Sequence, residues 1–98
     1  MYYREQLELA KKYEIDVISL DVANEVDCIF DIEMTENEFE LCCNFIEQCF
    51  LKSEYVSIWC IARALYDMIT DEENELSIKE LIDNTSKWDL IEKASWYN

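Results

Sequence analysis

The chain has 98 residues, enough for one hydrophobic core but not for two, so we expect a single domain over residues 1–98. It contains no glycine and no proline, which disfavours a sheet protein because tight β-hairpins need glycine at positions of positive φ. Its 23 acidic and 8 basic residues give a net charge of −15, which disfavours direct binding to nucleic acid or to an anionic membrane, since both require Lys and Arg.

Apolar residues at helical spacing predict a first helix over about residues 3–13. A short extended connection follows, and Asp16 or Ser19 is the expected N-cap of a second helix that ends near Asp31. The inward stripe of this second helix is expected to consist of Ile18, Val22, Val26, Ile29 and Phe30.

A capping box predicts that the third helix opens at Thr35. Its hydroxyl is expected to accept from the backbone N–H of Glu38, whose carboxylate reaches back to the backbone of Thr35. Apolar residues then recur at steps of three and four, as expected for one buried face: Phe39, Cys42, Cys43, Ile46, Cys49 and Phe50.

The fourth helix is expected at about residues 54–70 and is apolar on nearly all sides, which is typical of a helix surrounded by others. A membrane span is disfavoured, because Arg63 and Asp67 interrupt a stretch already shorter than the roughly 20 residues that a span needs. These two residues form an i, i+4 pair on the expected exposed strip.

Two short helices are expected to complete the chain. Ser77 with Glu80 repeats the capping-box pattern, and Ser86 with Asp89 is the expected opening of the last helix. The predicted fold is therefore all-α, a compact bundle of five or six short helices around the central helix at about residues 54–70.

The sequence favours a binding protein over an enzyme. Without histidine a Cys or Ser nucleophile lacks its usual base, and without glycine no phosphate-binding loop can form. No C-x-x-C spacing supports a zinc site, so we expect no catalytic residue, no cofactor and no metal ligand. All five cysteines are expected to be reduced thiols: Cys28, Cys42, Cys43, Cys49 and Cys60. Of these, Cys42, Cys43 and Cys49 lie on the apolar stripe, where a free thiol behaves as a small hydrophobic side chain.

A cytoplasmic location is expected from the same residues. The N-terminus lacks the basic flank and apolar core of a signal peptide, and five cysteines, an odd number, do not make a complete disulfide framework.

The acidic residues are unevenly distributed. Between Tyr13 and Leu51 there is no Lys or Arg, and like charges four residues apart on a helix repel. A protein that tolerates this repulsion is expected to use the resulting field, with rows of carboxylates imitating a phosphate backbone. The candidate partner-binding residues are Asp21, Glu25, Asp27, Asp31, Glu33, Glu36, Glu40 and Glu47.

Two other groups of residues admit both a binding role and a simpler one. A second acidic patch at residues 71–75 either extends the binding surface or is a solvated loop. The aromatic residues near the termini either anchor a partner or pin the terminal helices to the core: Tyr2, Tyr3, Trp88, Trp96 and Tyr97.

These features predict an inhibitor that occupies the basic nucleic-acid-binding groove of a partner protein, with no direct contact to nucleic acid or membrane. In overall character the chain is similar to anti-CRISPR and anti-restriction proteins of phages and mobile elements, which are small, acidic and non-catalytic. The expected partner is a basic nucleic-acid-processing enzyme or complex, and the chain itself is expected to be a monomer or a homodimer.

Two alternatives remain open. One is an immunity protein that neutralises a basic nuclease toxin, because residues 35–39 are similar to the helix openings of acidic helical immunity proteins. The other is a structural or adaptor domain whose acidity only provides solubility. Salt-dependent binding would distinguish the groove-occupying inhibitor and the immunity protein from the adaptor. Competition by nucleic acid would distinguish this inhibitor, which mimics nucleic acid, from the immunity protein.

Overall fold

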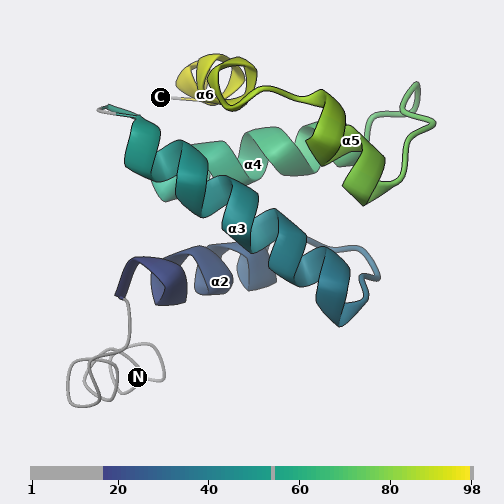
Figure 1. The fold of residues 1–98 in the computed structure, drawn as a ribbon, viewed down its shortest axis with the longest axis horizontal. Coiled ribbons are helices and arrows are strands. Elements are labelled where there is room, and N and C mark those ends of the chain that lie inside the picture. Colours follow the sequence, from purple (N-terminus) through teal and green to yellow (C-terminus); the bar gives the residue numbers. More distant parts are fainter. Residues whose placement is uncertain (1–16, 54, 98) are drawn as a thin grey trace.

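The computed structural model describes residues 17–53 and 55–97, and these ranges contain five α-helices and no β-strand. The helices, labelled as in Figure 1, are α2 (Val17–Ile29), α3 (Glu36–Lys52), α4 (Ile58–Ile69), α5 (Ile78–Asn84) and α6 (Lys87–Ser95). The predicted all-α fold is confirmed, while the predicted helix at about residues 3–13 lies outside the described residues. Among the described helices, none has the length and apolar character needed to cross a membrane.

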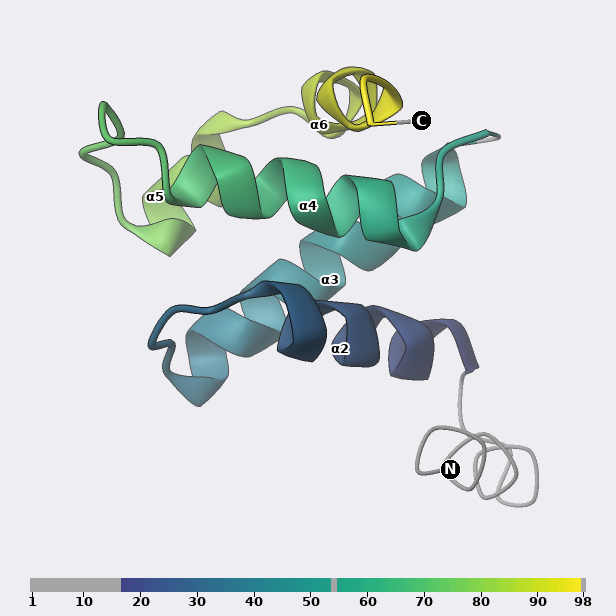
Figure 2. The same ribbon diagram turned by 180° about the vertical axis from the view of Figure 1, so that it is seen from behind.

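The helices pack in two layers. Figures 1 and 2 show α2 and α4 side by side, with α3 crossing both of them diagonally. Helix α6 packs on α4 and α3, and α5 packs on α3. The start of α3 therefore lies beside the end of α2, and its last turn lies at the opposite end of the molecule (Figure 1).

Local capping determines where most helices begin. The Thr35 hydroxyl accepts from the backbone N–H of Glu38 at 3.2 Å, and the Glu38 carboxylate accepts from the backbone N–H of Thr35 at 2.9 Å, so the predicted capping box is confirmed. Ser77 and Glu80 form the second predicted box. The Ser86 hydroxyl accepts from the backbone N–H of Asp89 and opens α6.

The predicted start of the central helix, at about residue 54, was wrong. Helix α4 begins at Ile58, with Ser57 as its N-cap, and ends at Ile69. The Ser53 hydroxyl accepts hydrogen bonds from the backbone N–H groups of Tyr55 and Val56. These bonds form a serine turn, which keeps the residues before Ser57 from joining the helix. The hydrogen bonds of Ser53 and Ser57 therefore determine where α4 begins, and the apolar periodicity does not.

The core consists of side chains from all five described helices. No polar or charged side chain in the described ranges is buried. Burying one large aliphatic side chain contributes about 1.5–3 kcal/mol, so these contacts dominate the stability of the fold. The largest fully buried side chains are Val22 and Val26 of α2, Cys42, Ile46 and Cys49 of α3, Ile61 and Leu65 of α4, and Leu90 of α6.

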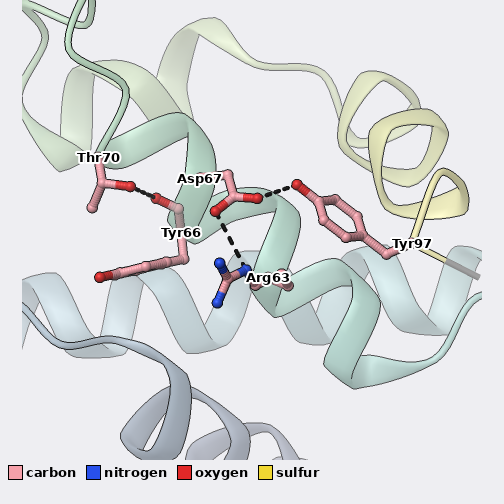
Figure 3. Close-up of polar contacts among 5 residues, drawn as sticks. All are labelled: Arg63, Tyr66, Asp67, Thr70 and Tyr97. Carbon is pink, nitrogen blue, oxygen red and sulfur yellow. Dashed lines mark hydrogen bonds and ion pairs between the residues drawn. The ribbon is translucent and has the colours of Figure 1, made fainter.

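Helix α4 contacts α2, α3 and α6, as expected for a central helix. Its exposed side lies near its first turn, where Trp59 is 45% exposed. The predicted Arg63–Asp67 pair forms on this helix, with Arg63 Nε 3.4 Å from Asp67 Oδ1 (Figure 3).

Candidate functional site

The eight predicted partner-binding acids all lie at the surface. Asp21, Glu25 and Glu47 are half-exposed, and the other five are exposed: Asp27, Asp31, Glu33, Glu36 and Glu40. Within residues 17–53 and 55–97, the one ion pair is Arg63–Asp67 on α4, so no described cation neutralises any of the eight. Their negative charge is therefore available to attract a positively charged molecule in solution.

Three of these acids form a row along α3. Glu36, Glu40 and Glu47 are spaced by four and seven residues, which places them on one helix face over about 16 Å. Cys43 lies on the same face, and its thiol pKa is raised to about 11, first by burial and then by the charges of Glu47 and Glu40. The thiol is therefore protonated near neutral pH, and the negative charge of the row comes from carboxylates alone.

Helix α2 does not carry a matching row. Residues two apart on a helix differ by about 200° in direction, so Asp27 lies on the opposite flank from Glu25. Asp21 shares the flank of Glu25. Asp31 lies beyond the end of α2 at Ile29, so Asp27 and Asp31 do not form an i, i+4 pair on this helix. We call the remaining six acids the acidic face: Asp27, Asp31, Glu33, Glu36, Glu40 and Glu47.

Glu47 also has a structural role. Its carboxylate accepts a hydrogen bond of 2.7 Å from the Ser19 hydroxyl, which joins α3 to α2. This end of the acidic row is thus held in place by the neighbouring helix, while Glu36 and Glu40 are exposed.

A groove of about 540 Å³ opens where α2 ends and α3 begins. We call it the acid-rimmed groove, because Asp27 from α2 and Glu36 and Glu40 from α3 line it together with apolar side chains and Thr35. Its volume falls within the range of about 300–1,000 Å³ that is usual for ligand pockets. The apolar residues that line the groove are Val26, Phe30, Ile32, Met34 and Phe39.

The sequence contained an indication of this groove that our prediction missed. Residues 31–34 read Asp-Ile-Glu-Met, and in this connection, which bends at Ile32, Asp31 and Glu33 are exposed whereas Ile32 and Met34 are partly buried against the core. Alternation of polar and apolar residues predicts that successive side chains face opposite sides of the chain. Ile32 and Met34 were therefore identifiable as inward-facing residues beside the predicted acids.

Helix ends add to the charge of the groove. The carboxyl end of a helix carries a partial negative charge, and the last turn of α2 holds Asp27 and no basic residue. The first turn of α3 supplies a partial positive charge, which Glu36 and the capping carboxylate of Glu38 already offset. The helix end thus adds negative charge on the α2 side, and carboxylates keep the α3 side negative as well.

Two exposed tryptophans lie at the two ends of α6: Trp88 in its first turn and Trp96 at its C-cap. Trp96 is 75% exposed and Trp88 is 59% exposed, with the Lys52 ammonium 5.4 Å from the centre of the Trp88 ring. Tyr97 has the pinning role instead, because it contacts the ring of Trp59 edge-on and donates a hydrogen bond to Asp67 (Figure 3). Tyr2 and Tyr3 lie outside the described residues.

The buried cysteines Cys42 and Cys49 do not resemble reactive thiols. Burial raises the pKa of Cys42 to about 12 and that of Cys49 to about 11, so both are protonated near neutral pH. All five cysteines are free, and no group of three or more potential metal-binding side chains occurs in the described ranges.

Comparison of the chain with protein-family models, with curated proteins and with solved structures finds no match.

Proposed function

We propose that this protein is an inhibitor whose acidic face docks onto the basic, nucleic-acid-binding groove of a partner protein, as anti-CRISPR and anti-restriction inhibitors do. The observation that carries the proposal is that no described basic side chain neutralises the negative charge of the acidic face. No described cation pairs with any acid of the face, although five of the eight basic residues lie elsewhere in the described chain. Such a surface is costly in an isolated protein and favourable against a basic one.

Long-range attraction is the first step of this mechanism. A net charge of −15 on a small domain produces a field that raises the association rate with a basic groove, by about 10–1,000-fold in steered complexes. Salt screens this field, with a Debye length of about 10 Å at 0.1 M ionic strength. The association rate is therefore expected to fall steeply as salt is added.

The α3 row supports imitation of a phosphate backbone in direction and scale. A DNA strand carries about one phosphate per 3.4 Å of axis, so about 16 Å of strand presents roughly five charges. Glu36, Glu40 and Glu47 present three over that length, and the other acids of the face add to them. The mimicry is thus of charge and extent, not of atomic positions.

Affinity capture from host lysate at low salt tests the proposal, with elution by a salt gradient and identification by mass spectrometry. The expected result is a basic nucleic-acid enzyme that added DNA or RNA displaces. A basic nuclease that binds regardless of nucleic acid would instead indicate an immunity protein. An acidic or neutral partner retained at high salt would mean that the charge serves solubility and that the proposal is wrong.

Charge reversal tests which surface binds. The variant Asp27→Lys, Glu36→Lys, Glu40→Lys is expected to abolish capture of the partner. The matched control reverses three exposed acids between α4 and α5, namely Glu72→Lys, Glu73→Lys and Glu75→Lys, and changes net charge by the same amount. Equal loss in both variants would contradict a binding surface confined to the acidic face, because either residues 71–75 extend the surface or total charge alone decides binding.

A further inference from the structure

We infer that the acid-rimmed groove is the anchor of the acidic face and that it takes a cationic amphipathic segment of the partner. The apolar side chains of this segment enter the groove, and its Lys or Arg side chains meet the acidic rim. This inference rests on the proposed function and names the chemistry that the partner must present at this site.

The two kinds of lining residue carry the argument. Phe39, Ile32 and Met34 are partly buried and provide apolar surface, and the buried ring of Phe30 borders the groove. Every charged residue in the lining is acidic. A purely apolar ligand would desolvate the carboxylates of the rim without pairing them. A purely cationic ligand would leave the apolar lining exposed to water.

The distribution of charge around the groove gives the segment two contact points. Asp27 lies on the α2 side, where the helix end adds negative charge and no basic residue offsets it. Glu36 and Glu40 lie on the α3 side, one helical turn apart. A segment lying across the apolar lining is therefore flanked by carboxylates on both sides, which suits cations on both edges of an apolar stripe.

The size of the groove favours a polypeptide segment. About 540 Å³ accommodates more than one side chain, and the lining comes from two helices and their connection. An amphipathic helix with apolar residues at i, i+3, i+4 and i+7 is the usual occupant of a groove with an apolar floor. A small polycation such as spermine lacks the apolar groups to fill it.

The probe for this inference is a synthetic amphipathic peptide of about four helical turns, with Leu on one face and Lys elsewhere. Its binding to the full chain is measured by fluorescence anisotropy, at about 0.1 M and about 1 M salt. Two reference ligands are an oligolysine of equal charge and the same peptide with each Leu replaced by Ser. The amphipathic peptide is expected to bind at least about tenfold more tightly than either and to retain binding in high salt.

Variants locate the peptide on the protein. Ile32→Thr with Met34→Gln removes apolar lining, and is expected to weaken the amphipathic peptide about tenfold while leaving oligolysine unchanged. Leu51→Gln is the matched control, because Leu51 is exposed at the other end of α3. Circular dichroism of each variant establishes that it is folded, and the Leu→Ser peptide gives the same comparison on the unaltered protein.

Several results would overturn the inference: equal binding of oligolysine, displacement of the peptide by spermine, or equal weakening by Leu51→Gln. Its failure is distinguishable from failure of the proposed function. If the amphipathic peptide binds in the groove but nucleic acid does not compete with the natural partner, the inference about the groove holds and the proposed nucleic-acid mimicry is wrong. If nucleic acid competes but the variant Ile32→Thr with Met34→Gln captures the partner normally, the proposed mimicry holds and the groove is not the anchor.

Discussion

The phenol of Tyr97 donates a hydrogen bond to the carboxylate of Asp67, which on its other side holds the Arg63 guanidinium (Figure 3). Tyr97 follows α6, and Asp67 and Arg63 lie on α4, so this contact ties the end of the described chain to the central helix. The hydrogen bond to Asp67 is the main reason that the pKa of Tyr97 is raised, with burial and the Asp67 charge adding to it and Arg63 opposing it.

This relationship predicts a pH-dependent stability difference for Tyr97→Phe. A group whose pKa is raised by folding stabilises the protein below its unfolded pKa, about 10 for tyrosine, and loses that contribution as pH rises through the folded pKa. We expect Tyr97→Phe to lower the free energy of unfolding near neutral pH by less than about 1 kcal/mol, because the contact is largely exposed to solvent. Urea unfolding at neutral and alkaline pH measures it.

The two proteins should converge in stability above about pH 10, where the phenol ionises. Tyr55→Phe is the control, since Tyr55 is 69% exposed. A constant difference between wild type and Tyr97→Phe at every pH would contradict this explanation.

The hydrogen bond between Ser19 and Glu47 predicts the effect of Ser19→Ala. Loss of the hydroxyl leaves the half-buried Glu47 carboxylate without this donor, and hydrogen bonds to charged groups are worth about 1.5–3 kcal/mol when buried. At this partly exposed site we expect a loss of about 1 kcal/mol in the free energy of unfolding, measured by urea denaturation. Ser95→Ala, which removes an exposed bond to the Glu92 carbonyl, should cost less.

Equal effects of the two serine variants would mean that the α2–α3 contact adds no stability beyond local helix effects.

Thiol accessibility makes a third prediction. Cys28 is the exposed cysteine, whereas Cys42 and Cys49 are buried and their raised pKa values keep them as thiols. Brief alkylation of the native protein with iodoacetamide near neutral pH should therefore modify Cys28 first, as read by intact mass and peptide mapping. In Cys28→Ser the fast phase should disappear, and fast labelling of Cys42 would show that the core opens readily.

Sequence reasoning succeeded where structure is decided locally. The capping boxes of Thr35 with Glu38 and of Ser77 with Glu80 are short-range patterns with a defined hydrogen-bond geometry, and both form as predicted. The start of α4 was missed because two equally local bonds set it: the Ser53 hydroxyl accepts from Val56 in a turn before the helix, and the Ser57 hydroxyl caps the helix itself.

The candidate site was less predictable, because it depends on how elements pack. The acids were found from their charge, but the groove between Asp27 and Glu36 exists only when the connection at residues 30–35 folds back against the core. Helical phase would have separated Glu25 from Asp27 in advance, since positions two apart cannot share a face. The alternation at residues 31–34 identifies two lining residues, but the depth of a groove between two helices has no signature in sequence.

The groove makes a last prediction, which concerns stability and binding together. Asp27 lies in the last turn of α2, where the helix end is negative and no cation is present, so its charge opposes folding. Asp27→Asn is therefore expected to raise the free energy of unfolding by about 0.3–1 kcal/mol at low ionic strength, with the gain shrinking in salt. Asp89→Asn is the matched control and should be destabilising, because Asp89 lies in the first turn of α6, where negative charge is favourable. If Asp27→Asn both stabilises the chain and weakens capture of a basic partner, the charge at the groove is retained for binding at a cost in stability. If it stabilises the chain and leaves capture unchanged, Asp27 is not part of the docking surface.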